Sequence, residues 1–230
     1  MWKSEDITET DRIIDDIEYI GESLSCNTMI VGITITSSVL LSSITSKVKP
    51  LGNLVINQYT ILNPVEYANG IEEPKKTLLK SSRINVSKIG DSLLINFSEI
   101  PISSSKCAKK LIEIAKPHQI IVLTSKHFSY IIDKDCQPNN IYTISSDGNS
   151  NFPAPNTING VPAALLIQSQ INHIDCKVHI VIDEDSGTSI QSLNVLYEQI
   201  KQYVGSNDEV VNKAFDIYQL RINDLGMIYT

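Results

Sequence analysis

The residues best placed to carry out chemistry follow an apolar segment late in the chain, where residues 178–182 lead into Asp183, Glu184 and Asp185. Carboxylates at the end of a buried strand can hold Mg²⁺, and one of them can act as a nucleophile. One function open to this sequence is therefore that of a small Mg²⁺-dependent α/β phosphatase or hydrolase that uses Asp183 and Asp185. The other interpretation is a solvated loop whose carboxylates cap the next helix.

The phosphatase interpretation rests on a partial match to a known motif. In haloacid-dehalogenase-like phosphatases two aspartates flank one residue and a threonine follows shortly after, whereas Ser186 is an extra residue in this sequence. Those enzymes resemble one another in carrying the motif near the N-terminus, and further catalytic residues lie downstream. Only about 45 residues follow Asp185 here, so the loop interpretation is favoured.

A second group of reactive types is His173, Cys176 and His179, which are spaced three residues apart. Residues an odd number of positions apart on a strand point to opposite faces, so Cys176 and His179 are not expected to share a ligand. A zinc site would also need a fourth ligand. The four cysteines are widely separated and form no CxxC pair, which predicts reduced, structural thiols. We therefore expect no catalytic residues, no metal and no cofactor.

The third candidate is the closing tripeptide Ile228, Tyr229 and Thr230. An aliphatic side chain, a phenol ring and a terminal carboxylate suit C-terminal capture by a pocket on another protein. A PDZ-type strand-addition pocket is disfavoured, because such pockets prefer an apolar last residue. A frayed end and a tail folded back on the core remain alternatives.

An amphipathic helix is predicted to position this tail. Apolar residues recur at three- and four-residue steps over residues 207–225, which indicates a helix with one face packed on a core. Gly226 stands where a left-handed helix cap is common, so the helix is expected to stop there and to release a short tether.

The amino-acid composition limits the kinds of partner that this protein can bind. The net charge is −7, charged residues make up 20% of the chain, and no basic cluster is longer than a Lys-Lys pair. These values argue against nucleic acid or an anionic membrane surface as the main partner. The start has no apolar core typical of a signal peptide, and no segment approaches twenty apolar residues. We expect a soluble protein of the cytoplasm, with the nucleus left open as a second location.

The chain divides into three predicted parts. Residues 1–25 form an acidic, partly mobile N-terminal segment, in which Ile13, Ile14, Ile17 and Ile20 are spaced as one short helical face. Residues 26–225 form a single α/β domain, and residues 226–230 form the docking tail. A chain of 230 residues can bury a substantial core in one domain.

Strands and helices alternate at both ends of the domain. The predicted strands cover residues 28–36, 54–62, 78–86, 91–97, 119–124 and 176–182. The predicted helices cover residues 37–48, 106–116, 159–172, 190–204 and 207–225, with Ser186 or Thr188 capping the fourth. Residues 63–74 are expected to form a loop, as are residues 125–155 apart from short strands around Tyr130 and 141–144. This order predicts a three-layer α/β/α domain with a mixed β-sheet and an inserted hairpin.

Three segments together resemble the proteasome assembly chaperone 1 family. They are the closing Ile228-Tyr229-Thr230, the segment 155–166 (PNTINGVPAALL) and the early strand and helix over residues 29–43. The match is one of order and spacing over most of the chain. The Val-Pro-Ala-Ala helix start and the final tripeptide are its most specific parts.

This resemblance implies a protein that is not an enzyme. It implies a chaperone that pairs with a related subunit, proteasome assembly chaperone 2, and binds the outer face of the proteasome α-ring. Such a heterodimer promotes assembly of the α-ring and of the core particle, and it blocks premature binding of activators. The family's hydrophobic-Tyr-X tail enters a pocket between adjacent α subunits, a role that the resemblance gives to Ile228, Tyr229 and Thr230.

Overall fold

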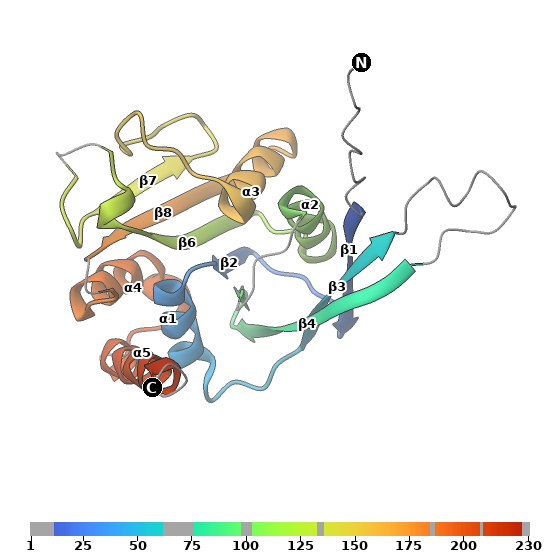
Figure 1. Cartoon of the computed structure of the whole chain (residues 1–230), viewed down its shortest axis with the longest axis horizontal. Helices are drawn as coiled ribbons and strands as arrows, with labels where there is room; N and C mark the ends of the chain where they lie inside the picture. Colours follow the sequence, from blue (N-terminus) through green and yellow to red (C-terminus); the bar gives the residue numbers. More distant parts are fainter. Residues whose placement is uncertain are drawn as a thin grey trace, which may run out of the picture.

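The computed structural model describes residues 12–61, 76–97, 103–132, 136–184, 187–207 and 209–226. Its centre is an eight-stranded mixed sheet with the order β1-β3-β4-β5-β2-β6-β8-β7 (Figure 1). The strands are β1 (Arg12–Gly21), β2 (Thr28–Gly32), β3 (Gly52–Ile61), β4 (Lys76–Ile89), β5 (Ser92–Asn96), β6 (Gln119–His127), β7 (Ile141–Ser145) and β8 (Asp175–Asp183). The helices are α1 (Ile35–Thr45), α2 (Ser104–Ala115), α3 (Gly160–Ile171), α4 (Ile190–Val204) and α5 (Glu209–Gly226).

Four parallel strands, β5, β2, β6 and β8, form the middle of the sheet. Every residue of β2 is buried, as expected for a strand covered by helices on both faces. The antiparallel strands β1, β3 and β4 extend the sheet on one side, and β7 closes the other side. The carboxyl ends of the four parallel strands therefore share one edge of the sheet.

Helices cover the sheet in two layers. α2 and α3 pack on one face, with a core that includes Leu111, Val161 and Leu165. α1, α4 and α5 pack on the other face, with a second core that includes Leu40, Leu196 and Val211 (Figure 1). The predicted three-layer α/β/α class with a mixed sheet is thus confirmed.

The predicted hairpin is also confirmed. β4 and β5 pair antiparallel, and Ile89 faces Ser92 across a two-residue turn. Gly90 takes a φ of 55° in this turn. Glycine adopts this left-handed conformation without a Cβ penalty, which is why a Gly-containing two-residue loop favours a tight hairpin.

The N-terminal expectation of a short helical face is wrong, because this stretch forms the edge strand β1 inside the predicted 1–25 segment. The four isoleucines fit a helical spacing, but β-branched residues also favour strands, and pairing with β3 decides the outcome. Ile17 and Tyr19 pack on the core, and the buried Asp15 accepts a hydrogen bond from the Ser103 amide at the start of α2.

Smaller differences lie at element ends. β6 runs to His127 rather than Thr124, and a 3-10 turn, η2 (Phe128–Tyr130), replaces the strand expected near Tyr130. Ser189, not Ser186 or Thr188, caps α4, since its Oγ accepts from the Ser192 amide. α5 runs through Gly226, where the sequence predicted a helix stop. The loop expected at residues 63–74 lies outside the described residues.

The fully buried Leu111 provides a test of the α2 layer. Leu111→Ala leaves a cavity between α2 and the sheet, so we expect the free energy of unfolding to fall by about 2–5 kcal/mol in urea titrations. Lys106→Ala, an exposed change on the same helix, should alter it by no more than about 0.5 kcal/mol. Equal effects of the two substitutions would contradict the placement of α2.

Candidate docking site

α5 is the element that leads to the predicted docking tail. Its 18 residues make a rod of about 27 Å. Val210, Val211, Ala214 and Tyr218 recur at helical spacing and are buried against α1 and α4. The remainder of the helix surface is mostly exposed. One stripe therefore holds α5 on the body.

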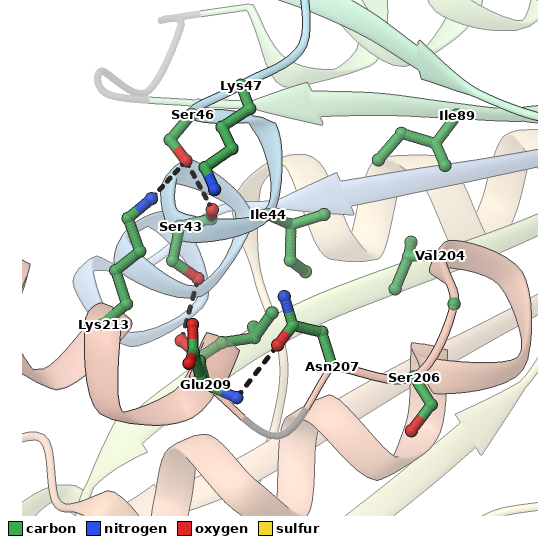
Figure 2. Close-up of a pocket in the computed structure, with 12 residues that line it drawn as sticks. Ser43, Ile44, Ser46, Lys47, Ile89, Val204, Ser206, Asn207, Glu209 and Lys213 are labelled. Carbon is green, nitrogen blue, oxygen red and sulfur yellow. Dashed lines mark hydrogen bonds between the residues drawn. The ribbon is translucent and has the colours of Figure 1, made fainter.

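Hydrogen bonds fix the first turn of α5 to the last turn of α1 (Figure 2). Ser43 Oγ lies 3.1 Å from the carbonyl oxygen of Val210 and 2.8 Å from that of Leu40, so its single proton is shared between the two acceptors. Lys213 Nζ donates to Ser46 Oγ. Asn207 Oδ1 accepts from the Glu209 amide over 3.0 Å and so caps the helix start. The residues that make these bonds line a small pocket of about 190 Å³ between α1 and the α4–α5 connection. They fix where α5 begins.

The far half of α5 is fixed at the carboxyl ends of the parallel strands. The Tyr218 hydroxyl accepts a hydrogen bond of 3.1 Å from the buried Thr188 amide. Arg221 Nη1 donates to Ser38 Oγ near the start of α1, over 3.3 Å. The direction of α5, and thus the point at which the chain continues beyond Gly226, is set by contacts at its first turn, at Tyr218 and at Arg221.

A buried polar cluster lies beneath this contact. Thr36 Oγ1 donates to Asp183 Oδ2 over 2.6 Å and lies 2.8 Å from Thr188 Oγ1. The three side chains join the start of α1, the end of β8 and the segment before α4. Asp183 is only 7% exposed, and its Oδ1 has no hydrogen-bond partner among the described residues. Asp183 therefore belongs to a buried contact that joins three parts of the fold. Asp185 lies outside the described residues.

A groove of about 580 Å³ runs between the first turn of α4 and the last turns of α5. Its apolar wall includes Ile190, Phe215, Tyr218 and Ile222. Ile190 and Ile222 are 41% and 42% exposed, so each leaves a large apolar surface open to solvent. Polar side chains, among them Glu184, Gln191 and Gln219, complete the lining of the groove, which lies near the helix end from which the predicted tail continues.

The histidine and cysteine candidates do not form a metal site. Cys176 packs in the α2–α3 core, whereas His179 points to the other face and lies 3.0 Å from Thr143 Oγ1 through its Nδ1. His173 is exposed. Within the described part of the chain, no group of three or more His, Cys, Asp or Glu residues is arranged to hold a metal ion.

The cysteines are buried and free. Burial raises the pKa of Cys26 to about 11 and the pKa of Cys107 and Cys176 to about 12. Thiols that remain protonated at neutral pH are poor nucleophiles and poor metal ligands. The predicted structural role of these side chains agrees with their burial.

The predicted docking residues Ile228, Tyr229 and Thr230 lie outside the described residues. The sequence did not predict the residues that position α5, the helix that precedes this tail. Thr36, Thr188 and Tyr218 form their contacts across 30 to 152 positions of the chain. Their only sequence signals were a serine- and threonine-rich helix start and a tyrosine on the apolar stripe of α5, neither of which names a partner.

The structure is that of an α/β protein whose last described helix, α5, packs on the body of the fold. No helix in the described part of the chain is long and apolar enough to cross a membrane. No protein-family model matches the sequence, and no curated protein matches it.

Solved structures do match. The chain is similar to Pyrococcus furiosus PbaA, an archaeal homologue of proteasome-assembly chaperone, with 10% identity and a TM-score of 0.57 over 91% of this chain and 96% of that chain. It is also similar to P. furiosus PbaB, an archaeal proteasome activator, with 10% identity and a TM-score of 0.58 over 93% and 99% of the two chains. The Mycobacterium tuberculosis proteasome-assembly chaperone homologue Rv2125 matches with 7% identity and a TM-score of 0.55 over 86% and 94%. At these identities the likeness shows a shared fold.

The Tyr218 contact can be tested by removing one oxygen atom. Tyr218→Phe leaves the buried Thr188 amide without its acceptor, so we expect the free energy of unfolding to fall by about 1–3 kcal/mol in urea titrations. Tyr203→Phe removes a hydroxyl whose partner, Gln119, is only partly buried and can turn to water. Tyr203→Phe should therefore lower the free energy of unfolding by less than Tyr218→Phe does. A larger loss for Tyr203→Phe would contradict the proposed role of Tyr218 in holding α5.

The buried His179 predicts a pH dependence of stability. Burial, with a smaller effect of Lys177, lowers its pKa from 6.5 to about 4. Below pH 6.5 the unfolded chain therefore binds a proton that the folded chain does not. Stability should fall by up to about 1.4 kcal/mol per pH unit until the folded form also protonates near pH 4. Urea titrations of His179→Gln should show a shallower loss over this range, whereas an identical slope would contradict the burial.

Proposed function

We propose that this protein is a proteasome assembly chaperone that binds the outer face of the proteasome α-ring through its C-terminal tail. The observation that carries the proposal is the combination of this fold with the closing Ile228-Tyr229-Thr230 sequence. Two further observations support it: proteins of the same fold include a proteasome-assembly chaperone homologue and a proteasome activator, and α5 is held to the body at its first turn and at its middle.

The chemistry of the tail fits a pocket between two α subunits. The terminal carboxylate would pair with a lysine, the Tyr229 ring would be buried with its hydroxyl bonded, and Ile228 would supply apolar contact. Burial of both side chains contributes only a few kcal/mol at about 25 cal/mol per Å², before the cost of ordering the tail. A second tail on a related subunit, proteasome assembly chaperone 2, would raise the overall affinity through avidity. The heterodimer of this protein with proteasome assembly chaperone 2 would promote assembly of the α-ring and of the core particle. It would also exclude activators that use the same pockets.

The phosphatase alternative is disfavoured by the state of Asp183. A nucleophile or metal ligand must reach substrate, but this carboxylate is buried and already accepts a hydrogen bond from Thr36. We therefore propose that the protein is not an enzyme and requires no cofactor. As a separate proposal, it acts in the cytoplasm, with the nucleus as a second candidate location.

The direct test is affinity for purified α-subunit rings and core particles. Tyr229→Ala removes the ring that the pocket would bury, so we expect affinity in biolayer interferometry to fall at least about tenfold. One extra glycine after Thr230 should have a similar effect, because it moves the carboxylate away from its lysine.

Tyr130→Ala supplies the matched control, since Tyr130 is 72% exposed and lies in η2, on a different element from α5. It should bind as the wild type does. Full affinity of the Tyr229→Ala variant would refute the tail as the docking element. Mg²⁺-dependent phosphatase turnover that is lost in Asp183→Asn would instead favour the enzyme.

A further inference from the structure

The length of the tail limits where its receptor can lie. Tyr229 is the third residue after Gly226. Three fully extended residues span at most about 10 Å, so a pocket that takes the Tyr229 ring must open within roughly that distance of the end of α5. Ile222 lies one helical turn before Gly226, at about 6 Å along the axis. Any protein that takes this tail must therefore bring its surface close to the last turns of α5.

The surface found there is a groove with a mixed lining, in which apolar side chains on both walls lie beside polar ones such as Gln191 and Gln219. The groove is lined on one side by Ile190 from the first turn of α4, and on the other by Phe215 and Ile222 from α5. Ile190 and Ile222 are each about two-fifths exposed, at 41% and 42%. Large open side chains on both walls of one groove are typical of a surface that another protein covers.

The groove is held in shape by hydrogen bonds. Ser189 Oγ and Ser192 Oγ, at the start of α4, both donate to Asn139 Oδ1, over 2.6 and 2.9 Å. On the opposite wall, the Tyr218 hydroxyl is fixed by the Thr188 amide. Pre-formed walls lose little entropy when a partner binds, so this surface suits docking.

We propose that the groove between α4 and α5 is a second docking surface, which takes an apolar side chain from the rim of the same pocket that receives the tail. This inference rests on the proposed function and extends it from the tail to the folded body. Ile190 and Ile222 are the specificity-determining contacts. The two contacts act on one partner at once, so the groove makes a weak tail interaction tight and sets the orientation of the body on the ring.

The test compares three matched chains that all keep the tail. Ile190→Ser with Ile222→Ser removes both apolar contacts, and serine has a helix propensity close to that of isoleucine, so folding should be retained. Ile167→Ser is the control, because Ile167 is 54% exposed and lies on α3, on the other side of the sheet. Against purified α-subunit rings, we expect about a tenfold loss of affinity for the double variant and wild-type affinity for the control. Hydrogen exchange should also slow at the start of α4 when the wild type binds.

Each other result has a defined meaning. If the wild type and control bind, Tyr229→Ala does not, and the double variant binds like the wild type, the second surface is refuted while the tail proposal stands. If the double variant binds more tightly, the chain's own tail occupies the groove, which also overturns the inference. A change in the oligomeric state of the double variant in ultracentrifugation would assign the groove to a second copy instead. If the wild type fails to bind, the proposed function and this inference fail together.

Discussion

The packing of α5 on α1 and α4 is the constraint on which the proposed docking surface depends. The apolar stripe that includes Val211 and Ala214 supplies most of the burial, but apolar contact alone leaves a helix free to slide or turn. Polar contacts along the helix remove that freedom: Ser43 contacts the first turn, Tyr218 at the middle of α5 binds the Thr188 amide, and Arg221 further on donates to Ser38. A helix fixed in this way gives the chain beyond Gly226 a defined starting point and direction.

The buried polar cluster around Asp183 lies beside α5 and helps to hold this part of the fold together. At the carboxyl ends of parallel strands, an α/β fold commonly places a ligand site. Here Thr36 forms hydrogen bonds with both Asp183 and Thr188 at that edge, and α5 packs beside them. The position that serves for catalysis in many α/β enzymes is used here to join three elements.

Sequence patterns predicted most of the fold and only part of the candidate site. Long buried strands such as β2 and the amphipathic α5 were predicted because their apolar spacing records local structure. β1 was missed because the spacing of its isoleucines also fits a helix, and only pairing with β3 decides between the two. The anchors Thr36 and Tyr218 could not be predicted, since a hydrogen bond between distant segments leaves no periodic signal. The tail could be proposed because its chemistry is contained in three consecutive residues.

In the proposed function, the final three residues connect this fold to the proteasome α-ring. The most direct measurement is affinity purification from cell extract with quantitative mass spectrometry, comparing the intact chain with one that lacks Ile228, Tyr229 and Thr230. The intact chain is expected to enrich proteasome α subunits together with a related chaperone subunit. The shortened chain is expected to keep the chaperone subunit and to lose most of the α subunits. Equal recovery of α subunits by both chains, or none by either, would contradict the account.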